Sequence, residues 1–147
     1  MAATRSAHTV WNGDLFTGSG RTTLDTSGLG TYDVTWRART EQAEGKTSPE
    51  ELIGAAHSAC YSMAFSNMLK EAGHVADTIE TRADVDFVPG EGITEIRLTV
   101  NATIPGIGED DFQRIAEEAK KGCPVSQALA SVPSITLAAT LNGQSPA

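Results

Sequence analysis

The clearest pattern of apolar and polar residues lies in the second half of the chain. Mostly apolar side chains occupy every second position over 79–87 and over 96–104, with charged or polar side chains between them. A period of two is typical of half-buried strands with one solvated face. Because the segment 89–92 joins them with one proline and two glycines, the pattern predicts a long β-hairpin. The same alternation predicts a final strand over 134–141.

The first forty residues carry a weaker strand signal. An Asn-Gly-Asp turn and two later glycines separate three segments, and we expect a strand in each, over 9–11, 21–25 and 32–40. Side chains two positions apart lie on the same face of a strand. A strand over 32–40 would therefore present Arg37 and Arg39 on one face.

Helices are expected between the strands. Ser48 begins a capping box with proline at the first helical position, and Gly73 supplies a stop, so the first helix spans about 49–72. Its middle is apolar nearly all round, which indicates a central buried helix. A second helix is predicted over 109–121, with acids at its start, lysines at its end and a glycine after it. A short helical turn over 126–130 completes an α+β chain.

Composition excludes several classes of function. The formal net charge is -8 with only 11 Lys and Arg, so we expect no nucleic-acid partner. The sequence shows no apolar run that predicts a signal peptide or a membrane span, and we expect one cytoplasmic domain over 1–147 with a frayed tail at 142–147. Two cysteines and three scattered histidines do not match the paired spacings of structural zinc, so no metal or other cofactor is expected.

The two cysteines are the best candidates for chemistry. Cys60 lies in an apolar stretch of the first predicted helix, and Cys123 follows the stop of the second. Cytoplasmic thiols are usually kept reduced, and such a pair favours thiol redox chemistry. The alternative is that both are buried structural residues, since free cysteine often behaves as a small apolar side chain.

Peroxide cleavage by Cys60 would require a thiolate, and burial opposes the charged form. No Lys or Arg lies between Glu51 and Phe65, so the stabilising charge must come from elsewhere in the fold. Arg37 and Arg39 are both candidates, because a guanidinium stays charged in a dry pocket. Either arginine could instead be a solvated surface charge.

The segment from Ser48 to Cys60, together with Gly-Cys-Pro-Val-Ser-Gln around Cys123, resembles the OsmC/Ohr family of organic hydroperoxide reductases, most closely its OsmC branch. The resemblance implies an OsmC-like fold, with curved antiparallel sheets around two central helices of an intertwined homodimer. It implies that Cys60 is the peroxidatic cysteine and Cys123 the resolving cysteine, joined as an intrachain disulfide after turnover. The implied site also contains an activating arginine and a Glu50 that positions it. The match of residues 33–36, which precede the arginine, favours Arg39 for this role, and Arg37 remains an alternative.

The resemblance also implies an organic hydroperoxide as substrate and a dithiol as reductant. The Ohr branch uses lipoylated proteins, so a lipoylated donor is one expected partner. Two other classes stay open. His57 precedes Cys60 by three positions, as in a Cys–His acyl-transfer hydrolase, although no second histidine or nearby Asp or Asn would orient it. The second class that stays open is a non-catalytic, stress-induced binding protein.

Helix geometry constrains where Glu50 can act. Ten residues of helix separate Glu50 from Cys60 by about 15 Å along the axis and about 80° around it. Two antiparallel copies crossing near Ala55 and Ala56 would instead bring Glu50 of one chain level with Cys60 of the other. The small residues around this midpoint, including Gly54, would allow a close approach. We therefore expect a homodimer with two composite sites.

Overall fold

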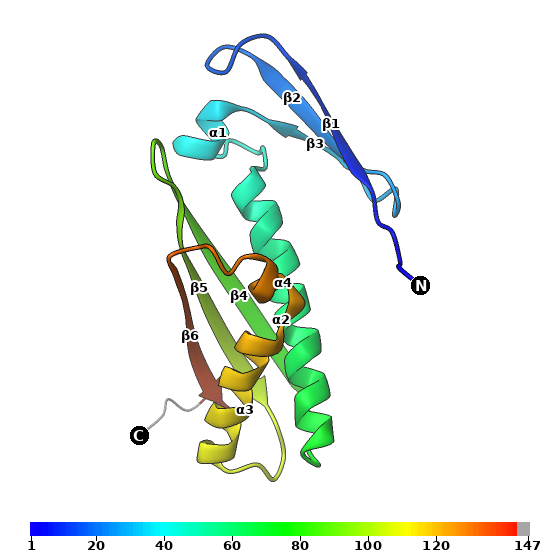
Figure 1. Ribbon diagram of the computed structural model, residues 1–147, viewed down its shortest axis with the longest axis vertical. Helices are drawn as coiled ribbons and strands as arrows, with labels where there is room; N and C mark the ends of the chain where they lie inside the picture. Colours follow the sequence, from blue (N-terminus) through cyan, green and yellow to red (C-terminus); the bar gives the residue numbers. More distant parts are fainter. Residues whose placement is uncertain (144–147) are drawn as a thin grey trace.

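The computed structural model describes residues 1–143 and confirms the predicted α+β class. Ten elements follow one another along the chain (Figure 1): β1 (Ala7–Asn12), β2 (Ser19–Leu24), β3 (Thr31–Val34), α1 (Trp36–Thr40), α2 (Pro49–Glu71), β4 (Thr78–Val88), β5 (Gly92–Thr103), α3 (Glu109–Gly122), α4 (Pro124–Ala128) and β6 (Ser134–Leu141).

The main sheet has the strand order β4-β5-β6. Strands β4 and β5 form the predicted hairpin, with Val85 opposite Ile96. The expectation of wholly antiparallel sheets is wrong at one pair, because β6 runs parallel to β5 with Ile135 opposite Ile96. The chain crosses back through α3 and α4 before it enters β6, and a crossover of this kind is what joins parallel neighbours. The two longer helices, α2 and α3, lie on one face of this sheet (Figure 1).

Helix α2 forms where the capping residues predict it. The Ser48 hydroxyl accepts a hydrogen bond of 3.1 Å from the Glu51 amide, and Gly73 follows the helix with a φ of 90°. One face of α2 is buried in the core. This face includes Gly54, His57, Tyr61, Phe65 and Leu69. A Cβ on Gly54 would lie 3.2 Å from the carbonyl oxygen of Ala83, so the absence of a side chain lets α2 approach β4 closely.

The opposite face of α2 is not buried within the chain. Ala55, Ala56 and Ala59 are exposed, and Met63 keeps 71% of its surface accessible. Within the single chain, the predicted central helix is therefore buried on one face only. Gly54 also lies against β4 rather than among these exposed small residues.

The second sheet, β1-β2-β3, stands beyond the N-terminal end of α2 (Figure 1). Its strands are antiparallel, with Thr9 opposite Thr22 and Thr22 opposite Tyr32. Every residue of β1 is exposed, and Phe16 and Leu29 in the connecting loops are 75% and 77% exposed. Within the described part of the chain, this sheet therefore has no hydrophobic core of its own, and much of its surface is uncovered.

The third expected N-terminal strand, over 32–40, is wrong from Thr35 onward. The strand ends at Val34, and Thr35 begins helix α1 by accepting a 3.1 Å hydrogen bond from the Ala38 amide. A threonine that caps a helix supplies an acceptor that a continuing strand would not use. Arg37 and Arg39 consequently lie on a helix, where residues two positions apart point in nearly opposite directions.

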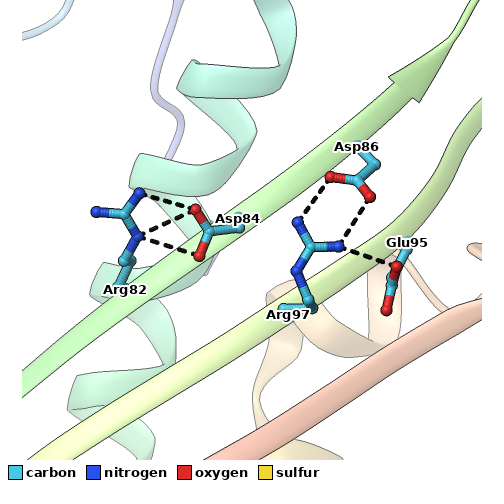
Figure 2. A network of polar contacts seen from close by, with 5 residues as sticks. All are labelled: Arg82, Asp84, Asp86, Glu95 and Arg97. Atoms are coloured by element: carbon cyan, nitrogen blue, oxygen red, sulfur yellow. Dashed lines mark hydrogen bonds and ion pairs between the residues drawn. The ribbon is translucent and has the colours of Figure 1, made fainter.

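The outer face of the β4–β5 hairpin is charged, as the alternating pattern predicts. Arg82 pairs with Asp84, and Arg97 bridges Asp86 and Glu95 at 2.8 and 2.9 Å (Figure 2). Hydrogen bonding to Arg97 holds the pKa of Asp86 below its ordinary value. These groups are solvated, so the network keeps this face polar and adds little to stability.

Two segments near the C-terminal end of the chain, helix α4 and the residue after β6, differ slightly from expectation. Helix α4 begins two residues earlier than predicted, since Pro124 occupies its first turn with Cys123 as the cap. At the other end of β6, the Asn142 side chain accepts a 2.9 Å hydrogen bond from the Ile104 amide, so residue 142 is not frayed. Residues 144–147 of the expected tail lie outside the described residues.

Candidate functional site

The fold brings the two cysteines together. Cys60 lies in the middle of α2, and Cys123 lies at the junction of α3 and α4. Both thiols are free; Cys60 packs against the core cluster that contains Cys123, and each thiol shifts the pKa of the other. Cys60 is half-buried, whereas Cys123 is fully buried at 0% exposure. A small solute therefore has access to Cys60 first.

The local environment shifts the pKa values of the two thiols in opposite directions. Burial and the neighbouring Cys123 raise the pKa of Cys60, against a weaker lowering by the Val125 amide. Burial also acts to raise the pKa of Cys123, but hydrogen bonds from the Ser126 amide, Cys60 and the Ser126 hydroxyl together lower it. Within one chain the negative charge is thus favoured on Cys123, and no cation contributes to the Cys60 environment in the described region.

Arg39 and Glu50 form a largely buried ion pair. The Arg39 Nε and Nη2 atoms donate three hydrogen bonds of 2.8 to 3.2 Å to both Glu50 carboxylate oxygens. The Glu50 side chain is 8% exposed and that of Arg39 28%. The Arg39 guanidinium also stacks against Phe87 at 4.0 Å and lies 5.9 Å from the Trp36 ring centroid. Stacking and the paired hydrogen bonds together fix its orientation.

Arg37 is placed differently. Its side chain is 65% exposed and pairs with Glu41 at 3.1 Å and Glu44 at 3.4 Å. The expectation that both arginines share one face is wrong, because α1 turns Arg37 outward and Arg39 toward Glu50. Of the two candidates, only Arg39 joins the predicted glutamate.

The arginine pair and the cysteine pair are separate within one chain. Glu50 lies in the first turn of α2 and Cys60 about three turns later along an unbroken helix. At about 1.5 Å per residue the two lie about 15 Å apart along the axis. The Arg39 guanidinium therefore does not reach the Cys60 sulfur of its own chain.

A largely apolar cavity of about 360 Å³ adjoins Arg39. Its walls come from the N-terminal sheet, from α1 and from the start of α2, and they include Trp11, Leu15, Trp36 and Leu52. Arg39 is the charged group in this wall, and Cys60 does not contribute to it. The cavity has the size and polarity of a site for a small apolar molecule.

His57 is a buried polar residue whose partner could not be found from the sequence. Its Nε2 atom lies 2.6 Å from the Ser126 hydroxyl, and its Nδ1 atom has no hydrogen-bond partner among residues 1–143. Burial lowers the pKa of His57, which favours the neutral ring. The ring thus contacts α4, and no hydrogen bond among the described residues joins it to Cys60, the contact that a Cys–His hydrolase would need.

The comparisons with known proteins identify the family. Residues 40–138 match the model of a family described as OsmC-like protein. The chain is 42% identical over 132 residues to Peroxiredoxin OsmC of Escherichia coli strain K12, which covers 88% of this chain and 92% of that protein. The chain belongs to the OsmC-like protein family. This confirms the resemblance seen in the sequence.

Other relatives of this OsmC-like chain extend the comparison. It is 30% identical over 93 residues to an organic hydroperoxide resistance protein-like protein of Staphylococcus aureus, covering 59% of this chain and 65% of that protein. The crystal structure of an OsmC-like protein from Mycoplasma pneumoniae superposes with a TM-score of 0.73 at 18% identity, over 96% of this chain and 99% of the other. The predicted OsmC-like fold is confirmed.

The described part of the OsmC-like chain holds neither a candidate membrane span nor a candidate metal site. None of the helices within residues 1–143 combines the length and apolar character needed to cross a bilayer. Over the same residues, no three His, Cys, Asp or Glu side chains gather in a way that could hold a metal ion.

Proposed function

We propose that this protein is a thiol-dependent peroxidase that reduces organic hydroperoxides to alcohols. The observation that carries the proposal is the contact between two free thiols from distant parts of the chain, one half-buried and one fully buried. Relatives named Peroxiredoxin OsmC and organic hydroperoxide resistance protein support the same reaction class. Reduced resting thiols also fit a cytoplasmic location, which is part of the proposal.

The proposed reaction has three balanced steps. The Cys60 thiolate attacks one peroxide oxygen, the O–O bond breaks, and the alkoxide takes a proton to leave as the alcohol, so Cys60 becomes a sulfenic acid. The Cys123 thiolate then attacks the Cys60 sulfur, and hydroxide leaves and is protonated to water. An external dithiol finally reduces the Cys60–Cys123 disulfide and is itself oxidised to a disulfide. Lipoylated proteins are one class of such dithiols.

Arg39 is proposed to stabilise the Cys60 thiolate and the developing alkoxide, with Glu50 holding the guanidinium in place. Since the pair does not reach Cys60 within one chain, we propose a homodimer in which each site combines Arg39 and Glu50 of one chain with both cysteines of the other. Two uncovered surfaces support this arrangement: the N-terminal sheet and the small-residue face of α2 around Ala56.

The apolar cavity beside Arg39 supports an organic substrate over hydrogen peroxide. Burial of a bulky substituent there should contribute roughly one to three kcal/mol, or about ten- to a hundredfold in efficiency. Comparing cumene hydroperoxide with hydrogen peroxide under the same reductant tests this point. Equal efficiency for the two would contradict the assignment of the cavity.

The decisive experiment is thiol titration after one equivalent of cumene hydroperoxide. The parent protein should lose two thiols per chain and form a disulfide. Dihydrolipoamide, thioredoxin and glutathione can then be compared as reductants of this disulfide. Cys60→Ser should consume no peroxide, whereas Cys123→Ser should consume one equivalent and stop at a sulfenic acid. Equal single-turnover consumption by the two variants would overturn the assigned roles.

The composite site has its own test. Glu50→Ala and Cys60→Ser chains should each be impaired alone, and heterodimers refolded from a mixture should regain about one intact site per pair. A matched mixture of Glu50→Ala with Arg39→Ala should recover nothing, because both changes fall on the same half-site. Recovery in the second mixture, or none in the first although heterodimers form, would exclude the shared arrangement.

A further inference from the structure

Two buried hydrogen bonds tie α2 to the chain segment that carries Cys123, and neither has a role in the reaction proposed above. In the first, called the histidine bond below, the His57 Nε2 and Ser126 Oγ atoms lie 2.6 Å apart and join α2 to α4. In the second, the tyrosine bond, the Tyr61 hydroxyl donates to the Ala116 carbonyl at 2.9 Å and joins α2 to α3. Within the described part of the chain, no other hydrogen bond links α2 to either helix.

Both bonds lie where solvent does not reach. The side chains of His57 and Tyr61 belong to residues that are 0% exposed, and Ser126 is 7% exposed. When a buried hydrogen bond breaks, the freed groups find no water to replace the lost partner unless the segment opens. The two bonds therefore oppose any separation of the junction between α3 and α4 from α2.

The α2 groups of these two bonds lie on either side of Cys60 along the helix. His57 precedes Cys60 by three positions and Tyr61 follows it directly, so the three residues span just over one helical turn. Their partners lie on either side of Cys123 in the same way, one before it in α3 and one after it in α4. The pair of hydrogen bonds thus flanks the pair of cysteines.

The backbone of Cys123 is itself fixed to both of the anchored helices. Its amide donates to the Ala119 carbonyl at 2.9 Å at the end of α3, and its carbonyl accepts a 3.0 Å hydrogen bond from the Gln127 amide in α4. The sulfur therefore moves away from α2 only if these backbone bonds break or the two anchoring bonds do. Cys123 is 0% exposed, as a closed junction requires.

We propose that the histidine bond and the tyrosine bond act together as a clamp that keeps the α3–α4 junction closed on α2. The clamp holds the Cys123 thiol beside Cys60 and away from reagents in solution. His57, Tyr61 and Ser126 are positioning residues in this proposal, since they act through the backbone of the two segments. The role of Cys123 as the resolving cysteine rests on the proposed function, but the clamp is a property of the resting protein.

The clamp bears on the second step of the proposed reaction. While Cys60 is still a thiol, a closed junction keeps an external disulfide from capturing Cys123 as a mixed disulfide. Once Cys60 is a sulfenic acid, Cys123 is already packed in the adjoining core cluster. The Cys123 proton leaves to solvent and the thiolate attacks the Cys60 sulfur. The S–S bond forms, the S–O bond breaks, and the hydroxide takes a proton from solvent to become water.

The first test labels Cys123 in the resting protein, in a Cys60→Ser background where it is the one remaining cysteine. Because this thiol is buried, iodoacetamide should reach it only when the junction opens, so the labelling rate reports the open fraction. Tyr61→Phe and Ser126→Ala should each raise the rate by about two- to tenfold, the range expected for the loss of one net hydrogen bond.

The matched control is Ser62→Ala. Ser62 is a half-buried serine of α2 whose hydroxyl lies 2.8 Å from the Ser58 carbonyl and 2.7 Å from the Thr81 hydroxyl of β4, away from the junction. It should label at the parent rate, which would show that the reagent does not enter through global unfolding. If Tyr61→Phe and Ser126→Ala also label at the parent rate while circular dichroism shows them folded, the clamp is excluded.

The double variant tests whether the two bonds act together. If a single opening breaks both bonds, Tyr61→Phe combined with Ser126→Ala should raise the labelling rate by the product of the two single increases, because their free energies of opening add. Two separate openings would give only the sum, which would overturn the joint clamp. Should Ser126→Ala fail to fold, Tyr61→Phe still decides, because it keeps the buried ring and leaves the Ala116 carbonyl its intrahelical partner.

Failure of the clamp and failure of the proposed function can be told apart. Labelling uses no peroxide, so it decides the clamp even if cumene hydroperoxide leaves both thiols of the parent protein intact. If peroxide does oxidise the parent, the double variant with both cysteines present should yield a larger share of Cys60 sulfinic acid under excess peroxide, because opening of the junction competes with resolution. An unchanged share would overturn the link between the clamp and the resolving step.

Discussion

The guanidinium carbon of Arg39 lies 4.0 Å from the centroid of the Phe87 ring. Phe87 lies at a β-bulge: Asp86 faces Glu95, but Phe87 faces Ile93, so β5 has one extra residue at this point. A bulge bends the strand and re-aims the side chains beside it. The tip of the hairpin thereby supplies the aromatic face that holds the arginine of the proposed site.

Phe87→Leu should therefore lower peroxidase activity without touching either cysteine. Loss of a partly desolvated cation–π contact is worth about 0.5 to 2 kcal/mol, which corresponds to about two- to thirtyfold in the rate of Cys60 oxidation. Single-turnover peroxide consumption measures this step directly. The neighbouring Val88→Ala change, at a 37% exposed position, should have little effect. Equal rates for the two variants would show that stacking does not position Arg39.

The Arg39–Glu50 pair also predicts a difference in stability between two arginine variants. Arg39→Ala leaves a nearly buried carboxylate without its partner, and we expect a loss of about 2 kcal/mol or more in the free energy of unfolding. Arg37→Ala removes only exposed pairs and should cost less than about 0.5 kcal/mol. Urea unfolding of both variants makes the comparison, and similar losses would mean that the buried pair is not the stronger contact.

The hairpin, α2 and α3 could be predicted because local signals and burial agree there. Ile96 and its alternating neighbours are buried on one face, and Ser48 caps α2 as its motif indicates. The strand expected over 32–40 failed because Thr35 starts a helix, which a weak strand pattern does not reveal. The parallel pairing of β6 and the contact of His57 with Ser126 depend on how distant segments pack, and no local pattern encodes either.

Burial of His57 predicts a pH dependence of stability. Its pKa is lowered in the folded chain, so the unfolded chain takes up a proton first as the pH falls below about 6.5. The contribution of His57 is thus fully present above that pH and is lost as the pH falls toward its folded pKa. His57→Gln should flatten this part of the profile of unfolding free energy against pH.

Ser62→Ala is the control for this profile, since it alters a polar residue of the same helix that does not titrate in this range. It should change the stability by the same amount at every pH. A pH profile for His57→Gln that runs parallel to the parent would contradict the prediction and would mean that the ring can be protonated inside the folded protein.

The exposed face of α2 gives the last prediction. Ala56 is exposed in the single chain, beside other small residues, at the point where two copies of α2 are proposed to cross. Arginine there should fold normally within the chain, because the side chain points away from its core, but would force a long charged group between two closely packed helices. Ala56→Arg should therefore shift the protein from dimer to monomer in light scattering and reduce peroxidase activity with it.

Ala72→Arg provides a matched control, since Ala72 is also exposed but lies at the far end of the helix, sixteen positions further along. It should stay dimeric and active. The monomer made by Ala56→Arg should still bring Cys60 and Cys123 together, so an added oxidant should still form the disulfide while cumene hydroperoxide reduction is slow. A dimeric and fully active Ala56→Arg protein would place the shared interface elsewhere and would remove the argument that Arg39 reaches Cys60 across it.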